Sequence, residues 1–159
     1  MLPPLHTKIL LRLYETLSPT EITWALTGST SFALQGLAVT PHDIDMQTDA
    51  PGAYAIERYL SAYVTQPVAF SAAQNIRSHF GRFAIEGLIV EVMGDIQKRR
   101  ADGSWEPSVP LKRYINYIVY QGMRLPVLSL AYERQAYLTL GRIERVRMIE
   151  EHLQQNRKQ

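Results

Sequence analysis

Apolar residues recur along the chain with two periods, one typical of helices and one typical of strands. A helical stripe spans 5–17, between two proline-containing segments. Further helices are expected at 30–37, 51–64, 128–140 and 143–153, the last two separated by Gly141. Strand-like runs lie at 22–27, 43–47, 67–70, 80–85, 88–93 and 115–120, and Glu86-Gly87 predicts a hairpin. The pattern predicts an α+β fold with a mixed sheet flanked by helices and with C-terminal helices.

The composition is that of a globular domain. Of 159 residues, 46% are hydrophobic and 20% are charged, which excludes a disordered or fibrous chain. We expect one domain over 1–159, with a core at about 20–96 and a C-terminal strand and helices at about 111–153. The absence of cysteine excludes disulfide bonds and thiolate metal sites. The net charge of +2 is too small to indicate nucleic-acid binding. No signal-peptide or membrane-spanning pattern is present, so a cytoplasmic protein without a membrane partner is expected.

Two aspartates lie close together in the strand-like run 43–47. Side chains two residues apart on a strand share one face, so Asp43 and Asp45 can bind the same divalent cation or a pair of cations. An edge strand with a polar outer side is the alternative. The pair alone is therefore weak evidence for a cation site, and further carboxylates nearby would strengthen it.

Glu91 interrupts the apolar run 88–93 and is the third carboxylate. A carboxylate at such a position is costly unless it is paired or binds a metal. An ion pair with Arg82 across the hairpin is the alternative. If the two strands are neighbours, three carboxylates come together and repel one another until a cation neutralises them. Their hard oxygen ligands predict Mg²⁺, with His42 and Asp95 as secondary candidates at the same place.

Gly28 and Ser29 end an apolar strand and begin a helix. Backbone N–H groups and a hydroxyl at such a turn can bind phosphate. The alternative is a plain turn in which Ser29 caps the helix without any ligand. Both interpretations use the same groups, and the sequence leaves them open.

Taken together, these residues resemble a known family. Gly28-Ser29, a spacer, Asp43-Ile44-Asp45 and a later acidic strand position at Glu91 resemble the minimal nucleotidyltransferases of the DNA polymerase β superfamily. The surrounding stretch is most similar to the small bacterial aminoglycoside and lincosamide nucleotidyltransferases. The resemblance covers 24–95 well and extends more loosely to the C-terminal helices.

The resemblance implies a two-metal transfer of a nucleoside monophosphate from an NTP, with ATP the expected donor. Asp43, Asp45 and Glu91 would hold Mg²⁺, and Glu91 would also assist in deprotonating the acceptor hydroxyl. Gly28 and Ser29 would hold the β- and γ-phosphates. The acceptor is left open between a small molecule, a protein and a tRNA, and a homodimer or a partner protein would complete the cleft. The alternative function is an inactive binding module, such as one member of a toxin–antitoxin pair.

The chain departs from the family pattern in its C-terminal part. Many relatives carry Lys-Asp shortly after Gly-Arg, where this chain has Glu144-Arg145, and some carry a lysine in place of Tyr137. The basic role would then fall to another residue or be absent, the candidates being Arg142, Arg134 and Lys112. Roles for Arg77, Arg82 and 98–100 are also left open, with a solvated basic loop preferred for the last of these.

Overall fold

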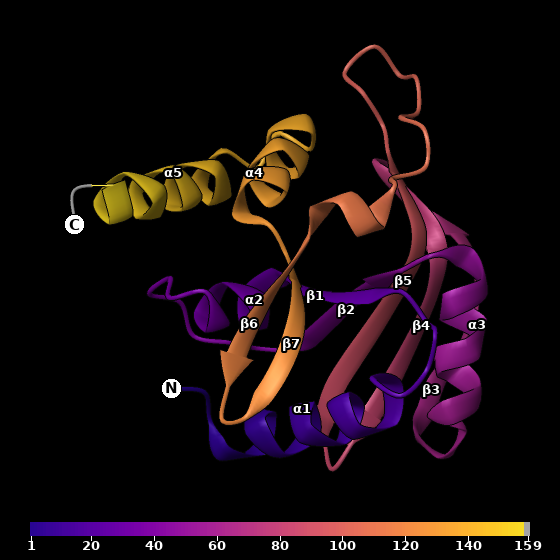
Figure 1. Ribbon diagram of the computed structural model, residues 1–159. Coiled ribbons are helices and arrows are strands. Elements are labelled where there is room, and N and C mark those ends of the chain that lie inside the picture. Colours follow the sequence, from indigo (N-terminus) through magenta and orange to yellow (C-terminus); the bar gives the residue numbers. More distant parts are fainter. Residues whose placement is uncertain (158–159) are drawn as a thin grey trace.

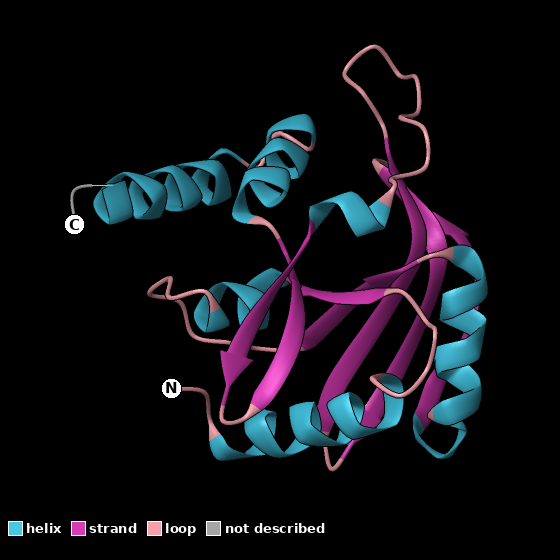
Figure 2. Ribbon diagram, viewed as in Figure 1, coloured by secondary structure: helices cyan, strands magenta, loops and turns pink. Residues whose placement is uncertain are grey.

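The computed structural model describes residues 1–157, in which helices and strands alternate at first, strands predominate in the middle and two helices follow (Figures 1 and 2). In chain order they are α1 (Pro4–Leu17), β1 (Trp24–Thr27), α2 (Gly28–Leu34), β2 (Ile44–Thr48), α3 (Ala50–Tyr59), the 3₁₀ turn η1 (Ser61–Tyr63), β3 (Val64–Ala72), β4 (Ile76–Ile85), β5 (Leu88–Lys98), η2 (Leu111–Tyr114), β6 (Ile115–Tyr120), β7 (Met123–Leu128), α4 (Leu130–Thr139) and α5 (Ile143–Arg157). Within this part of the chain, no helix is long and apolar enough to cross a membrane.

The strands form one seven-stranded sheet in the order β3-β4-β5-β2-β1-β7-β6. β2 is parallel to β5, and β1 is parallel to β7, whereas the other neighbouring pairs are antiparallel. This mixed sheet with its helices confirms the expected α+β class. β2 lies between β5 and β1, so the edge-strand interpretation of the aspartate segment is wrong.

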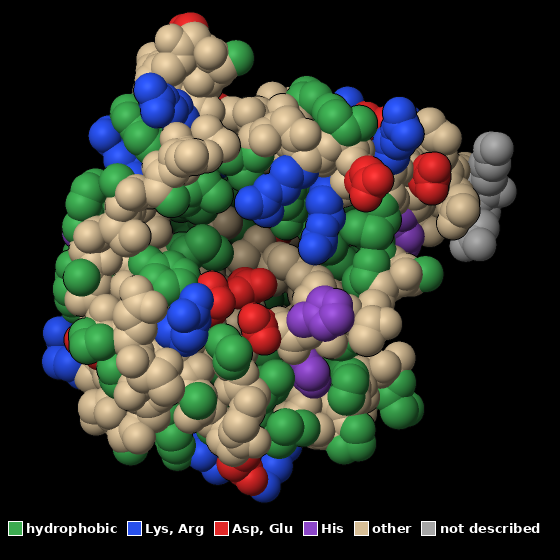
Figure 3. All heavy atoms as spheres, turned by 180° about the vertical axis from the view of Figure 1, so that it is seen from behind, with side chains coloured by type: hydrophobic (Ala, Val, Ile, Leu, Met, Phe, Trp, Pro, Cys, Tyr) green, Lys and Arg blue, Asp and Glu red, His purple; other side chains and the backbone are tan. Residues whose placement is uncertain are grey.

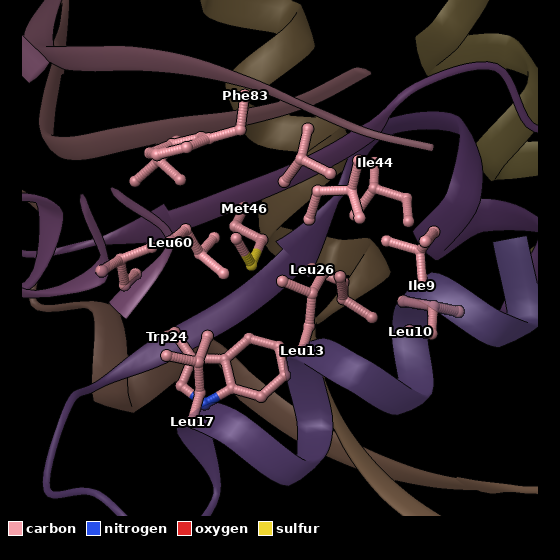
Figure 4. Close-up of a cluster of buried hydrophobic side chains, with 14 of the residues drawn as sticks. Ile9, Leu10, Leu13, Leu17, Trp24, Leu26, Ile44, Met46, Leu60 and Phe83 are labelled. Atoms are coloured by element: carbon pink, nitrogen blue, oxygen red, sulfur yellow. The ribbon is translucent and has the colours of Figure 1, made fainter. Parts of the chain in front are cut away.

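The main hydrophobic core lies on one face of this sheet, beneath α1 and α3. The helical stripe of α1 buries Ile9, Leu10 and Leu13 completely against the sheet (Figure 4). The sheet contributes residues that alternate along its central strands, such as Leu26 and Met46. Full burial of such side chains is worth about 1.5–3 kcal/mol each, which anchors the central strands firmly.

The opposite face of the central strands carries the polar positions of the alternation. In register, Thr27 is opposite Asp45, and Asp45 is opposite Glu91. Because their chain neighbours point into the core, these three side chains point to the other face. There α4 and α5 pack together, on the side of the molecule away from α1 (Figure 1), over a second apolar cluster that includes Phe32 and Ile149. The fold thus places the acidic positions between the sheet and the C-terminal helices.

Two expectations about the elements are wrong. The helix expected at 51–64 ends at Tyr59, and Val64 instead begins β3, which is longer than the expected 67–70. The expected elements do not include β7, and α4 begins at Leu130 rather than at residue 128. Pro126 lies within β7, where it is opposite Tyr117 of β6.

The helix after β1 begins earlier than expected, at Gly28 rather than at residue 30, and it ends at Leu34. Asp43 lies just before β2 rather than within it, because the strand begins at Ile44. Strands β4 and β5 extend well beyond the expected 80–85 and 88–93 but form the predicted hairpin through Glu86 and Gly87. These shifts move the ends of elements without changing their order.

Candidate functional site

The turn after β1 brings backbone and carboxylate into direct contact. Gly28 has φ +72°, a left-handed conformation that favours glycine. A Cβ added there would lie 2.6 Å from Oδ2 of Asp45. Only a residue without a side chain therefore allows this close approach. Gly28 and Asp45, both singled out from the sequence, are in contact.

The first residues of α2 fix the segment that carries Asp43. Ser29 is buried, and its Oγ accepts a hydrogen bond of 3.0 Å from the backbone N–H of His42. The hydroxyl of Thr30 donates to the carbonyl of Asp43 over 2.8 Å. Ser29 is not the helix cap, because Thr27 occupies the N-cap position and makes no side-chain capping bond. These side chains hold the 42–43 segment against α2.

The three predicted carboxylates influence one another. Burial raises the pKa of Asp45 to about 7, and the charges of Glu91 and then of Asp43 raise it as well. The guanidinium of Arg145 opposes them and lowers it. The structure thus brings Glu91 and Asp43 within electrostatic reach of Asp45, whereas Asp95 is not among the groups that act on Asp45.

Glu91 also makes the ion pair that was considered as its alternative role. Nη2 of Arg82 lies 3.3 Å from Oε1 of Glu91 across the hairpin. Nε of Arg82 is buried without a hydrogen-bond partner. Among residues 1–157, no three His, Cys, Asp or Glu side chains are placed to hold one metal ion together. Arg82 therefore partly neutralises the charge of Glu91.

Arg145 of α5 and Arg142 of the turn before it lie beside aromatic side chains, and Arg145 also acts on Asp45. Arg145 lies 5.6 Å from the ring centre of Phe32 and 5.8 Å from that of Tyr137, and Arg142 lies 5.9 Å from Tyr137. Arg145 also lines a cavity of about 430 Å³, together with Ser29, Val39, Thr40, His42, Glu144 and Met148. Figure 3 shows acidic side chains at a hollow in the surface, with basic side chains beside and above them and histidines next to them. This cavity joins the predicted phosphate turn to α5.

Two other basic candidates lie elsewhere. Arg134 is held by Glu150, with Nη2 2.7 Å from Oε1, and Lys112 lines a different cavity beside Tyr117. In the expected basic loop, Lys98 is instead a buried end of β5, where its ammonium donates to the hydroxyl of Tyr132 over 3.1 Å. Of the basic residues considered, Arg82 pairs with Glu91 and Arg142 lies beside Tyr137. Arg145, treated as a departure from the family pattern, is the cation that acts on Asp45.

The sequence interpretation missed Glu133, a buried acid of α4. Its carboxyl group accepts a short hydrogen bond from the hydroxyl of Thr27, and the backbone N–H of Gly28 also interacts with it. Burial raises its pKa to about 7, although both contacts and Lys98 lower it. A signal was present, because Glu133 lies on the helical stripe between Leu130 and Tyr137. An acid on a buried helix face needs an explanation.

Comparisons with known proteins show the family and the fold of the chain. The family model described as aminoglycoside-2''-adenylyltransferase matches residues 9–152. A candidate nucleotidyltransferase from Thermotoga maritima is 48% identical, with a TM-score of 0.85 over 98% of this chain and 96% of its own. The comparison with curated proteins found no match.

Two more distant structures share the fold. ANT(2'')-Ia, solved with adenylyl-2''-tobramycin, is 11% identical, with a TM-score of 0.59 over 93% of this chain and 89% of its own. The lincosamide antibiotic adenylyltransferase LnuA, solved with lincomycin, is 14% identical, with a TM-score of 0.52 over 94% and 97%. The expected resemblance to aminoglycoside and lincosamide enzymes is confirmed, and so is the expected nucleotidyltransferase. The chain belongs to the aminoglycoside-2''-adenylyltransferase family.

Proposed function

We propose that the protein transfers a nucleoside monophosphate from an NTP to the hydroxyl group of an acceptor, with Mg²⁺ as its cofactor and ATP as its donor. The observation that carries the proposal is that Asp45, in contact with the Gly28 turn, is opposite Glu91 in register and within electrostatic reach of both Glu91 and Asp43. The ATP donor is supported by the family model and by LnuA, both described as adenylyltransferases, and by the adenylyl-2''-tobramycin bound to ANT(2'')-Ia.

The donor set of this site suits a divalent cation. Asp45 is buried among like charges that raise its pKa, so a cation that binds there removes repulsion within the protein. Carboxylate oxygens are the ligands that Mg²⁺ prefers, and Asp43, Asp45 and Glu91 would supply them. Bound there, the metal would stabilise negative charge on the attacking and leaving oxygens. Binding also requires Glu91 to release Arg82, which lies 3.3 Å away.

The triphosphate is proposed to lie between the Gly28 turn and α5. Ser29 accepts a hydrogen bond from His42 and keeps its own hydroxyl proton to donate to a phosphate oxygen. Arg145 lines the same cavity as Ser29 and acts on Asp45. Arg142, near the same aromatic ring, would add a second positive charge. Guanidinium groups bind phosphate with two parallel hydrogen bonds, which suits this role.

The proposed reaction is a displacement at the α-phosphorus of the NTP. Glu91 takes the proton of the acceptor hydroxyl, whose oxygen forms a bond to the α-phosphorus of the NTP. The bond from that phosphorus to the bridging oxygen of pyrophosphate breaks, and pyrophosphate leaves with both electrons. The product is the acceptor esterified with a nucleoside monophosphate. A small-molecule acceptor is proposed ahead of a protein or a tRNA, because tobramycin and lincomycin accompany the two distant structures.

The position of a label in the donor tests this reaction. The protein is incubated with a cell extract and Mg²⁺, using ATP labelled either at the α-phosphate or at the γ-phosphate. Nucleotidyl transfer predicts labelled product from the α-labelled donor alone, and none from an Asp45→Asn variant. Label from the γ-phosphate would indicate a kinase instead, and no label from any NTP would leave only the inactive binding module.

A further inference from the structure

Glu133 lies beside the Gly28 turn and does not line the cavity that contains Arg145. Glu133 is 3% exposed and lies on the buried face of α4, close to the end of β1. The hydroxyl of Thr27 donates to its Oε1, and the backbone N–H of Gly28 interacts with the same carboxyl group. Two successive residues of the turn are therefore attached to one buried side chain.

A carboxyl group at this position is costly for the fold. Burial without full compensation costs free energy, and the neighbouring inward positions of α4 are Leu130 and Tyr137, which pack against apolar residues. In the part of the chain that the structure describes, Glu133 has no cation within ion-pair distance. Lys98, the nearest cation that acts on it, is paired with Glu106. The contacts that compensate the burial of Glu133 are those with Thr27 and Gly28.

Thr27 and Gly28, which contact Glu133, also lie next to Asp45. Thr27 is directly opposite Asp45 in the antiparallel register of β1 and β2. The Gly28 backbone approaches Asp45 so closely that a Cβ would be 2.6 Å from Oδ2. A shift of the turn by a fraction of an ångström therefore moves or frees the Asp45 carboxylate.

We propose that Glu133 is a positioning residue for nucleotidyl transfer, which fixes Thr27 and Gly28 and through them the carboxylate of Asp45. This inference rests on the proposed function, because it assigns Asp45 to the reaction. The relevant property of Glu133 is an acceptor oxygen in a fixed place, which glutamine also supplies. Misplacement of reacting groups by about 1 Å can reduce a rate about 100-fold.

Kinetics of three variants test the inference: Glu133→Ala, Glu133→Gln and Thr27→Val. Measured at saturating Mg²⁺ and nucleotide, kcat of Glu133→Ala is expected to fall about 100-fold, and Glu133→Gln to recover most of that loss. Thr27→Val removes the donor without changing side-chain shape. Its effect should not add to that of Glu133→Ala, since both remove one interaction. Glu150→Ala is the matched control, because it removes a carboxylate that binds α4 to α5 and should leave kcat unchanged.

The outcomes separate this inference from the proposed function. An active wild type whose Glu133→Ala variant keeps its kcat, even with lowered thermal stability, contradicts the positioning role alone. A Glu133→Gln variant as impaired as Glu133→Ala, or additive effects of Thr27→Val and Glu133→Ala, also contradicts it. A wild type without any transfer activity contradicts the proposed function itself, and the inference fails with it.

Discussion

At the scale of single residues, the site is defined by groups that are unfavourable for folding. Asp45 and Glu133 are buried acids, and the pKa of each is raised to about 7 mainly by burial. Gly28 has a left-handed backbone in contact with one of them. Unusual backbone conformations and buried ionisable groups concentrate at functional sites, because the reaction needs them even though they lower the stability of the fold. The consequences can be measured residue by residue.

The raised pKa of Asp45 predicts how an asparagine would affect stability. The folded protein retains this proton between the ordinary value of 3.8 and about 7, whereas the unfolded chain has lost it. The wild type therefore loses stability as the pH rises through this window. Asp45→Asn avoids this loss, so the metal-free variant should be about 1–2 kcal/mol more stable than the wild type at pH 8, and almost equal to it at pH 4. Urea unfolding at both pH values measures this difference. An Asp45→Asn variant that is less stable than the wild type at pH 8 would contradict the raised pKa of Asp45 in the folded protein.

The contact between Gly28 and Asp45 predicts different effects for two glycine substitutions. Gly28→Ala and Gly122→Ala both place a side chain on left-handed backbone, at φ +72° and +80°, and should each lose about 1 kcal/mol of stability. Only the first displaces Oδ2 of Asp45, because nothing lies within 4 Å of a Cβ at Gly122. Calorimetry with Mg²⁺ and a non-hydrolysable ATP analogue should show at least a tenfold loss of affinity for Gly28→Ala and none for Gly122→Ala. Equal affinities would argue against the predicted donor site at this turn.

At the scale of elements, α4 and α5 each present one face to the site. Residues two apart on a helix point in nearly opposite directions, so on α5 Arg145 is half-buried beside Phe32 and Tyr137, whereas Arg147 is exposed. On α4, the stripe that packs on α2 and α5 also carries Glu133 to the end of β1. The two C-terminal helices thus contribute one polar side chain each, Arg145 from α5 and Glu133 from α4.

The orientation of α5 predicts a contrast between two arginines. Arg145→Gln should weaken binding of the Mg²⁺–nucleotide complex about tenfold, because a guanidinium near Asp45 and Ser29 is lost. Arg147→Gln makes the same chemical change on the exposed side of the helix and should leave the affinity unchanged. Titration of both variants with a fluorescent ATP analogue measures the two dissociation constants. Similar effects of both substitutions would exclude a specific phosphate contact by Arg145.

At the scale of the whole molecule, the site forms where segments distant in sequence meet. The alternation of β1, β2 and β5 predicts the face on which Asp45 and Glu91 lie, and the parallel pairing of β2 with β5 makes them neighbours. This is why a family-like pattern of Gly28, Asp45 and Glu91 could be recognised from the sequence. The predicted α+β class depends on the same alternation.

The parts that were missed depend on tertiary contacts. The proposed role of Glu133 depends on its contact with Thr27, which is 106 residues away in the chain. No local sequence pattern predicts that contact. The strand β7 is hard to predict from the sequence because it contains Pro126, and proline usually interrupts a strand. The pairing of Pro126 with Tyr117 of β6 is visible only in the structure. The role of Arg145 likewise depends on how α5 packs over Phe32. Local periodicity predicts elements and their faces, whereas the contacts between faces come from the fold.

The most direct test of the central claim is the metal dependence of nucleotide binding. Isothermal titration calorimetry with a non-hydrolysable ATP analogue is performed with Mg²⁺ and with excess chelator, on the wild type and on the Asp43→Ala/Asp45→Ala variant. The proposed site predicts saturable binding of the wild type with Mg²⁺, at least tenfold weaker binding without it, and weak binding of the variant under both conditions. Equal nucleotide affinity in all four titrations would contradict a metal-dependent donor site at Asp43, Asp45 and Glu91.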